Sequence, residues 1–515
     1  MVYYTQLKFI NYKEVPAMKK LLSLLLASLL LTQIFVSCAE NTEEGSTDST
    51  VTADSGTAVS EMEEETEETE ITRENIPDNL PEKNFDGRTF TLLTRETDGI
   101  YYGDKFMPEE LNGEGVNDAL YERNIKIEER FGVDFAYVSK NSTWGNAQWN
   151  NEMTNSIMAG DGAYDLIAAY AATVSENISK NIFLNWREIP NIDLTQPWWS
   201  QRAIDALTVN GRSDLITGDY ALSLWDNMFA FIFNKKLAAD FGIENPYDLV
   251  RSGDWTLDKM SEITSAVSID LDGNGQWTVD DLYGLVTDWA TAIDTYQIAF
   301  DMPVVSHTAD GSLELALSSE KAVSIVEKLN NLYHTTHGAY TDSTASNLDT
   351  IYRADRALMY GTYFEKITAL RDMESDFGIL PYPKYDTAQE SYSSTSRDNF
   401  DLFVVPIDVK DPEFTGIITE ALCAESYRSV IPKYYDVVLK SKTSRDEESA
   451  EMIDIIRDSL TFDIGYLCSS SLSGIGHIFV GLIRSNSNDL VSKFASVEKP
   501  AKKLLEKMLV SYGIE

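Results

Sequence analysis

Buried strands and amphipathic helices alternate in the first half of this chain. The apolar pattern predicts, in order, a strand at 90–93, a helix at 116–131, a strand at 133–137, a helix at 148–159 and a strand at 164–169. This order predicts an α/β fold, in which a mostly parallel sheet is flanked by helices. Ligands bind beyond the carboxyl ends of the strands in such sheets, where Arg95 and Tyr170 stand.

The predicted helix at 116–131 rests on the spacing of its apolar residues. Val116, Leu120, Ile127 and Phe131 are separated by four, seven and four positions, so they share one face of a 3.6-residue period. Gly132 follows directly and suits the C-cap position. We therefore expect the helix to end at this glycine.

The middle of the chain repeats the alternation. Further strands are predicted at 229–233, 358–360, 377–380 and 400–405, with helices at 235–241 and 256–267 that Asn234 and Thr256 cap. The chain has 515 residues, of which 43% are hydrophobic. It can therefore bury a large core, and we expect two domains.

The N-terminal region has the layout of a bacterial lipoprotein signal. Residues 18–20 carry two lysines, residues 21–36 are almost wholly apolar, and Ser37 and Cys38 follow. The apolar stretch is shorter than the roughly 20 residues of a comfortable membrane span. We predict a true start at Met18, cleavage before Cys38 and lipidation of that cysteine. An ordinary secretory signal or a membrane anchor is the alternative.

Residues 38–83 are predicted to form an acidic, disordered tether. Residues 61–70 contain seven glutamates, and the stretch before them is rich in Ser, Thr and Gly. Like charges repel one another and extend a chain, and so little apolar area cannot offset the entropy of ordering. A solvated helix is the alternative. A tether would hold the folded part clear of the bilayer.

The charge and the cysteines exclude several classes of protein. The 42 basic and 83 acidic side chains give a net charge of −41, which repels phosphate backbones, so we expect no nucleic acid partner. Cys423 and Cys468 both stand in apolar surroundings. They are expected to be buried free thiols, although a disulfide between them is the alternative.

Five stretches of the chain occur in the order and with the motifs of one known family. They are residues 115–124 (GVNDALYERN), 161–166 (DGAYDL), 233–237 (FNKKL), 357–363 (ALMYGTY) and 377–384 (FGILPYPK). Together they resemble the extracellular solute-binding proteins of ABC importers, of the family 1 type that mostly serves sugars. The resemblance covers the chain from about residue 85 to the C-terminus, behind the lipoprotein signal.

The resemblance implies a two-lobed periplasmic-binding-protein-like fold with a hinge and a ligand cleft between the lobes. Lobe one would comprise 84–221 plus 382–432, and lobe two 222–381 plus 433–515, after a signal region at 1–37. A ligand that contacts both lobes would stabilise the closed form. That form would dock on separate ABC permease subunits. We expect a monomer that needs no cofactor, anchored at the extracellular face of the cytoplasmic membrane.

The candidate ligand residues are aromatic and polar side chains at strand ends and at the crossover between lobes. Sugars present apolar C–H faces and hydroxyls, which flat aromatic rings, carboxylates and amides match. The resemblance implies a stacking aromatic after Gly361. The candidates are Arg95, Tyr170, Trp225, Asp226, Asn227, Trp289 and Tyr363. A plain core position is the alternative for the tryptophans. Whether the ligand is a mono- or an oligosaccharide stays open.

Residues 270–281 match the twelve-residue calcium loop, in which alternating oxygens wrap a hard cation. The predicted ligands are the side chains of Asp270, Asp272, Asn274, Thr278 and Asp281 and the backbone carbonyl of Gln276. Asp281 stands at position 12, where Glu is usual. We predict a structural calcium ion, with a metal-free Asx/Gly turn as the alternative.

Two other classes of function stay open. An extracellular carbohydrate-active enzyme would need two carboxylates about 5–10 Å apart, which 83 acidic residues could supply. However, the sequence contains neither Gly-x-Ser-x-Gly nor His-Glu-x-x-His. A surface adhesin that binds glycans without a transporter is the third class. We expect a binding protein rather than an enzyme.

Overall fold

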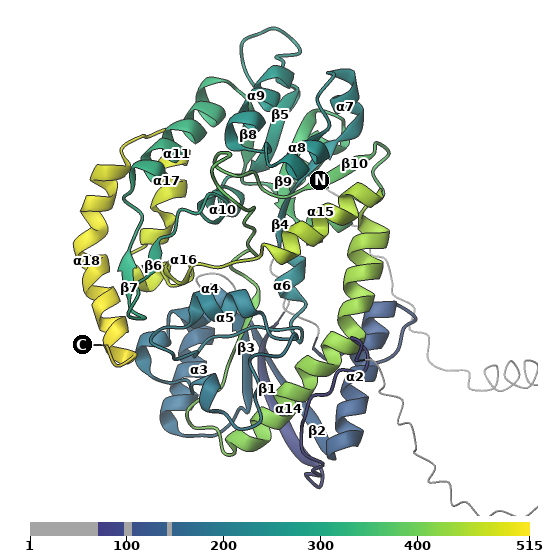
Figure 1. The fold of residues 1–515 in the computed structure, drawn as a ribbon, viewed down its shortest axis with the longest axis vertical. Helices are drawn as coiled ribbons and strands as arrows, with labels where there is room; N and C mark the ends of the chain where they lie inside the picture. The colour runs from purple at the N-terminus through teal and green to yellow at the C-terminus, as the bar shows by residue number, and fades with distance from the viewer. Residues whose placement is uncertain (1–70, 97–105, 142–146, 515) are drawn as a thin grey trace, which may run out of the picture. The chain divides into compact units, whose positions relative to one another are not determined.

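The computed structural model of the protein describes residues 71–96, 106–141 and 147–514. Its first sheet contains β1 (Arg88–Glu96), β2 (Val133–Asn141), β3 (Leu166–Tyr170) and β11 (Asp401–Val404), in the order β11-β3-β1-β2. Strand β1 runs parallel to β2 and β3, whereas β11 pairs with β3 in the antiparallel direction. The carboxyl ends of β1 and β3 therefore lie at one edge of the sheet, beside the start of β11 (Figure 1).

The second sheet is mixed. It contains β4 (Phe229–Asn234), β5 (Tyr283–Asp288), β8 (Ala339–Asp342), β9 (Ala357–Tyr363) and β10 (Phe377–Leu380), in the order β10-β4-β9-β5-β8. Strand β5 is parallel to β8 and β9, but β4 is antiparallel to β9 and β10. The mostly parallel sheet predicted for this lobe is thus only half parallel. The reason is the direction of β4, which starts where β9 ends, with Phe229 opposite Tyr363.

Helices cover both sheets (Figure 1). The longer ones are α2 (Gly115–Phe131), α3 (Ala147–Ala159), α9 (Leu257–Val267), α10 (Thr291–Ala299), α11 (Glu320–Asn330), α12 (Ala345–Arg353), α14 (Pro412–Glu425), α15 (Glu447–Asp458) and α18 (Leu490–Ser511). The shorter ones are α4 (Ala171–Ser175), α5 (Gln201–Leu207), α6 (Ser223–Asp226), α7 (Lys235–Asp240), α8 (Pro246–Ser252), α13 (Phe364–Ala369), α16 (Ile464–Leu467) and α17 (Ile478–Arg484). Strands β6 (Val305–His307) and β7 (Leu313–Leu315) form a separate hairpin, and the π-helical turns η4 (Asn331–Thr335), η5 (Ser426–Val430) and η6 (Pro432–Thr443) extend α11 and α14.

Capping residues fix the helix ends where the sequence predicted them. Helix α2 ends at Gly132, which has φ 59° and donates its N–H to the carbonyl of Glu128. A side chain at Gly132 would also collide with Asn84, because a Cβ there would lie 2.5 Å from Oδ1 of that asparagine. The side chains of Asn234 and Thr256 accept the backbone N–H bonds that start α7 and α9, so both predicted N-caps are confirmed.

The alternation of side chains along β1 joins it to two hydrophobic clusters. Phe90 and Leu92 pack into a cluster that includes Phe414 of α14, whereas Leu93 points into a second cluster with Trp149 of α3. Successive residues of a strand face opposite sides of the sheet, so both faces of this sheet are buried. Burial on both faces explains why the neighbouring residues Leu92 and Leu93 are both apolar.

The chain passes between the two sheets three times. It leaves the first sheet through α6 into β4, returns from β10 along residues 393–400 into β11, and leaves again through η5 and η6 to α15. Helix α15 packs on the second sheet, where Ile379 donates its backbone N–H to Ser449 Oγ over 3.0 Å. The exact bounds predicted for the two lobes stay a prediction.

Residues 76–83 differ from the predicted tether, because they contact the first lobe. Asp78 accepts hydrogen bonds from Arg130 of α2 at 2.6 Å and from Arg428 of η5 at 3.2 Å. Arg428 also donates to the carbonyl of Ile76. These ion pairs hold a segment whose composition alone is too polar to form a core. Residues 38–70 of the predicted tether and the signal region lie outside the described residues, and Cys38 is among them.

Both remaining cysteines are free and buried, as predicted. Cys423 lies in α14 and Cys468 directly follows α16. Burial raises the pKa of the Cys423 thiol well above its usual value. In the part of the chain that the structure describes, no helix combines the length and apolarity that a membrane span requires.

Candidate functional site

The segment that connects β10 to β11 contacts the ends of strands from both sheets. Arg397, in this segment, donates its backbone N–H to the carbonyl of Asn227 at the start of β4, over 2.8 Å. One residue further on, the carbonyl of Asp398 accepts the N–H of Ala172 in α4, over 3.2 Å. The segment therefore bridges the two sheets at the carboxyl ends of β3 and β9. We call the residues Arg95, Tyr170, Tyr363, Arg397, Asp398 and Asp401 the interlobe site.

Arg95 holds the first-sheet side of the interlobe site together. Its Nε donates to Asp401 Oδ1 over 2.9 Å, and neither side chain of this ion pair is exposed. The guanidinium also donates to the carbonyl of Asn399 and lies 5.2 Å from the centre of the Tyr170 ring. A buried guanidinium with several acceptors is held in one geometry, so the pair fixes the start of β11 against the end of β1.

Arg397 and Tyr363 form the second-sheet side. The guanidinium of Arg397 lies 5.3 Å from the centre of the Tyr363 ring and donates to its hydroxyl over 3.3 Å. Burial raises the pKa of Tyr363 to about 12, although the Arg397 charge lowers it. The tyrosine thus stays a neutral hydroxyl that both donates and accepts.

Asp398 connects the interlobe site to a histidine-centred cluster. It accepts a hydrogen bond from the Tyr170 hydroxyl over 3.3 Å. Burial raises the pKa of Asp398, against the nearby charges of Arg397 and His477. Both Asp398 and His477 line a cavity of about 80 Å³ between α4 and the 466–477 segment. This volume holds water rather than a sugar ring.

His477 is paired with a second buried carboxylate. Its Nδ1 lies 3.5 Å from Asp294 Oδ2, and the Tyr466 hydroxyl donates to the same oxygen over 3.2 Å. The bond to Asp294 raises the pKa of His477, whereas burial raises the pKa of Asp294. Carboxylates, phenols and an imidazole in one buried network offer both donors and acceptors to a hydroxylated ligand.

Four of the seven predicted ligand residues come together here. Arg95, Tyr170 and Tyr363 belong to the interlobe site. The carbonyl of Asn227 accepts a hydrogen bond from the backbone N–H of Arg397, which also belongs to this site. The Asn227 side chain itself donates to the carbonyl of Ser223 within α6. These residues stay candidates for ligand contact.

Trp225 and Asp226 have other partners, whereas Trp289 directly follows β5, whose Thr287 pairs with Gly361 of β9, so Trp289 also stays a candidate for ligand contact. Asp226 accepts a hydrogen bond from the hydroxyl of Tyr434 in η6. Trp225 packs edge-on against Tyr435 at 6.1 Å. Trp289 is 47% exposed, with the guanidinium of Arg484 at 4.5 Å from its ring. Neighbouring residues of a helical turn point in different directions. The side chains of residues 225–227 therefore contact different parts of the molecule.

The sequence reasoning missed the residues that unite the site. They are Asp294, Arg397, Asp398, Tyr466 and His477. One local signal was available, since Arg397 and Asp398 are charged residues just before the buried strand β11. Nothing in the local sequence brings Asp294 to His477, because their contact depends on how α10 and the C-terminal segment pack.

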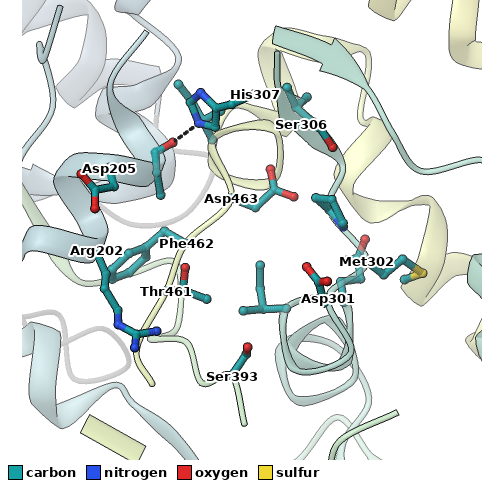
Figure 2. Close-up of a pocket in the computed structure, with 16 residues that line it drawn as sticks. Arg202, Asp205, Asp301, Met302, Ser306, His307, Ser393, Thr461, Phe462 and Asp463 are labelled. Carbon is teal, nitrogen blue, oxygen red and sulfur yellow. Dashed lines mark hydrogen bonds between the residues drawn. The ribbon is translucent and has the colours of Figure 1, made fainter. Parts of the chain in front are cut away.

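A larger cavity of about 610 Å³ lies between α5 and α10. Figure 2 shows Arg202 and Asp205 on one side of it and Asp301 and Met302 on the other. His307 Nε2 contacts the carbonyl of Ala206 over 3.1 Å, so the β6–β7 hairpin also bridges to α5 (Figure 2). None of the seven predicted ligand residues lines this cavity.

The 270–281 loop brings its predicted metal ligands together. Carboxylate oxygens of Asp270, Asp272 and Asp281 lie within 4.8 Å of one another. Asp270 accepts N–H bonds from Gly273 and Gly275, which folds the loop around its first residue. Three hard oxygen donors at this spacing fit a calcium ion. Side-chain oxygens of Asn274 and Thr278 instead cap backbone N–H groups, at Gln276 and Asp280.

Two sheets flanked by helices are joined by three crossing segments, and a buried polar site lies where their strand ends meet. This arrangement is the two-lobed fold of solute-binding proteins. Solved structures confirm this fold. The chain is similar to the cyclic α-maltosyl-1,6-maltose binding protein of Arthrobacter globiformis, with a TM-score of 0.54 and 11% identity over 82% of this chain and 99% of that one.

Two further solved structures share the fold. A cyclo/maltodextrin-binding protein complexed with maltotetraose gives a TM-score of 0.53 and 13% identity over 82% of this chain and 96% of that one. The GacH receptor of Streptomyces glaucescens GLA.O gives a TM-score of 0.52 and 13% identity over 82% of this chain and 99% of that one. No protein-family model matches the sequence, and a search of curated proteins finds no match.

Proposed function

We propose that this chain is the carbohydrate-binding subunit of an ABC importer. The observation that carries the proposal is the interlobe site, where two aromatic rings, two carboxyl groups and two guanidinium groups meet at strand ends of both sheets. Such groups bind sugar hydroxyls and stack on the C–H faces of sugar rings. The solved structures with this fold include proteins that bind maltodextrins and acarbose. The proposed role is capture rather than catalysis.

Closure about the crossing segments would couple capture to delivery. Arg397 stands in one crossing segment, and its hydrogen bonds reach Asn227 in another and Tyr363 in the second sheet. A sugar that bonds to this site contacts residues of both lobes, so it stabilises the closed state over the open one. The closed state would then be recognised by separate ABC permease subunits.

The lipid anchor and the calcium ion are further parts of the proposal. A lipid on Cys38 would keep the binding protein at the extracellular face of the cytoplasmic membrane, where a monomer can reach its permease. A calcium ion in the 270–281 loop would be structural, since the loop supports β5 through the Ile269–Leu282 backbone bridge.

Titration calorimetry with maltotriose, maltotetraose, glucose and galactose tests the ligand class, with spermidine and a tripeptide as controls. We expect at least one sugar to bind and Arg397→Ala to weaken its affinity at least tenfold, because the variant removes a buried charged donor. The matched control Arg353→Ala removes an exposed guanidinium paired with Asp372 and should bind as wild type does. Binding of the peptide alone, or full affinity in Arg397→Ala, would contradict the proposal.

A further inference from the structure

A second polar pocket, of about 440 Å³, lies apart from the interlobe site. It is enclosed by α5, α6, the π-helical turns η5 and η6, and the end of α15. Its volume falls within the roughly 300–1,000 Å³ of small-molecule sites. It shares no lining residue with the His477 cavity and meets the 610 Å³ cavity at Arg202. We call it the Asp219 pocket.

Asp219 is the unusual group in this pocket. The residue is only 6% exposed, and its carboxyl accepts no hydrogen bond from any residue that the structure describes. Burial raises the pKa of Asp219 to about 7, although Arg73 and Arg457 lower it through their charges. Because Asp219 lines the pocket, its carboxyl can bind a hydrogen-bond donor in the pocket that the described residues do not supply.

Aromatic rings form the walls of the pocket. Trp199, Trp225, Tyr427 and Tyr435 all line it. The indole N–H of Trp225 is buried and has no hydrogen-bond partner among the described residues. Trp225, one of the predicted ligand residues, thus lines this pocket. Flat aromatic faces, together with an unpaired acceptor and an unsatisfied donor, are features of a binding site rather than of a core.

Three guanidinium groups line the Asp219 pocket. Arg73 lies over the Tyr427 ring at 4.2 Å, and Arg457 lies over the Tyr435 ring at 4.7 Å while donating to Asp458 over 2.8 Å. Arg202 also lines the pocket and is exposed. These cations disfavour a cationic ligand.

We propose that the Asp219 pocket is a second ligand site that binds a neutral, hydroxylated ring such as one sugar unit. A ligand hydroxyl donates to the Asp219 carboxyl, and other ligand oxygens accept from Arg202. The C–H face of the ring packs on Trp225 and Tyr435. A sugar hydroxyl both donates and accepts, which matches a pocket that combines an unpaired acceptor with several donors. The inference does not depend on the interlobe site binding sugar.

Saturation-transfer NMR on the Arg397→Ala protein isolates this pocket from the interlobe site. The probes are glucose, galactose, mannose and N-acetylglucosamine at millimolar concentration. We expect at least one to bind to Arg397→Ala and to lose at least tenfold in affinity when Asp219→Ala is added. Asp205→Ala, which removes an exposed carboxylate of α5 outside this pocket, is the matched control and should leave binding unchanged.

A second variant tests the pocket even if the Asp219→Ala protein does not fold. Ser200→Trp fills the pocket from its wall without removing Asp219, and it should also abolish binding. The inference is overturned if none of the four sugars binds to Arg397→Ala, or if binding survives Ser200→Trp. Sugar binding that Arg397→Ala abolishes and Asp219→Ala spares would overturn this site and support the interlobe site. The reverse result would support this site and contradict the interlobe one.

Discussion

At the scale of single residues, buried charges set the energetics of the interlobe site. Arg95 and Asp401 form an ion pair in which neither side chain is exposed, and Arg95 also binds the carbonyl of Asn399. Removing one partner of such a pair leaves the other charge buried. The fold of the site therefore depends on this pair far more than on the exposed ion pairs of the surface.

Asp401→Ala should lower the free energy of unfolding by about 3–5 kcal/mol, because it leaves the Arg95 charge buried without its carboxylate. Asp372→Ala is the control, since Asp372 pairs with Arg353 but its side chain is 74% exposed. The free energy of unfolding of that variant should fall by less than about 1 kcal/mol. Urea unfolding monitored by tryptophan fluorescence measures both. Equal losses of unfolding free energy in the two variants would contradict the claim that the buried ion pair stabilises the fold more than the exposed one does.

A second residue-scale prediction concerns Glu420 in α14. Its carboxylate accepts the indole N–H bonds of both Trp198 and Trp199, at 2.9 and 3.0 Å. Burial nevertheless raises the pKa of Glu420 to about 8, from an ordinary value of 4.5. The folded chain thus binds this proton more tightly than the unfolded chain does. Its contribution to stability is present below about pH 4.5 and is lost as the pH rises to about 8.

Glu420→Gln removes this titration while it keeps one acceptor for the tryptophans. Between pH 5 and pH 8, wild type should lose on the order of 3 kcal/mol more of its unfolding free energy than the variant does. Denaturant unfolding at the two pH values measures the difference. The same pH dependence in both proteins would show that Glu420 does not titrate in this range.

At the scale of elements, the 270–281 loop is a local unit. Its carboxylates converge and its backbone N–H groups bind its own side chains, so the loop is shaped by sequence neighbours. The loop joins α9 to β5, and Arg356 before β9 reaches it through an ion pair with Asp280. A cation there would stabilise one end of the second sheet.

Calcium should raise the melting temperature of the purified chain by several degrees over the value in EDTA, because the ion binds the folded loop only. Asp270→Ala should abolish the increase by removing the first ligand. Asp240→Ala, at an exposed helix end outside the loop, should keep it. Differential scanning calorimetry with and without calcium decides the matter. An identical melting temperature in calcium and in EDTA would refute the proposed ion.

At the scale of the whole molecule, the proposed role needs the binding protein to stay near its permease. Two sheets joined by three crossing segments suit hinge closure, but closure alone does not deliver a ligand to a membrane. The sequence before residue 71 is where such an anchor is predicted, at Cys38. Anchoring and ligand binding are therefore separable properties.

Cys38→Ser should move the protein from the membrane fraction to the medium, because the residue that carries the lipid is lost. Ligand affinity should stay unchanged, and ligand uptake by the cells should fall. Fractionation followed by immunoblotting measures the location, and Ser37→Ala serves as the control. A Cys38→Ser protein that stays in the membrane fraction would contradict lipidation at this site.

The elements of this fold were predictable because their signals are local. The 3.6-residue spacing from Val116 to Phe131 and the glycine that follows define α2 within one short stretch. Asn234 and Thr256 cap their helices through bonds to residues three positions later. The calcium-loop pattern is equally local, and its carboxylates do converge. Chain order alone also gave the α/β class.

The ligand residues were only partly predictable because their contacts are not local. Tyr170 binds Asp398 across 228 positions of sequence. Trp225 and Asn227 are two positions apart, yet one lines the Asp219 pocket and the other joins the Arg397 segment. Side-chain periodicity fixes which residues share a face, whereas the packing of the sheets decides which faces meet. The sequence by itself thus determined the elements, their class and their order, and only the tertiary structure decided which strand ends form a site, because those contacts depend on how distant segments pack.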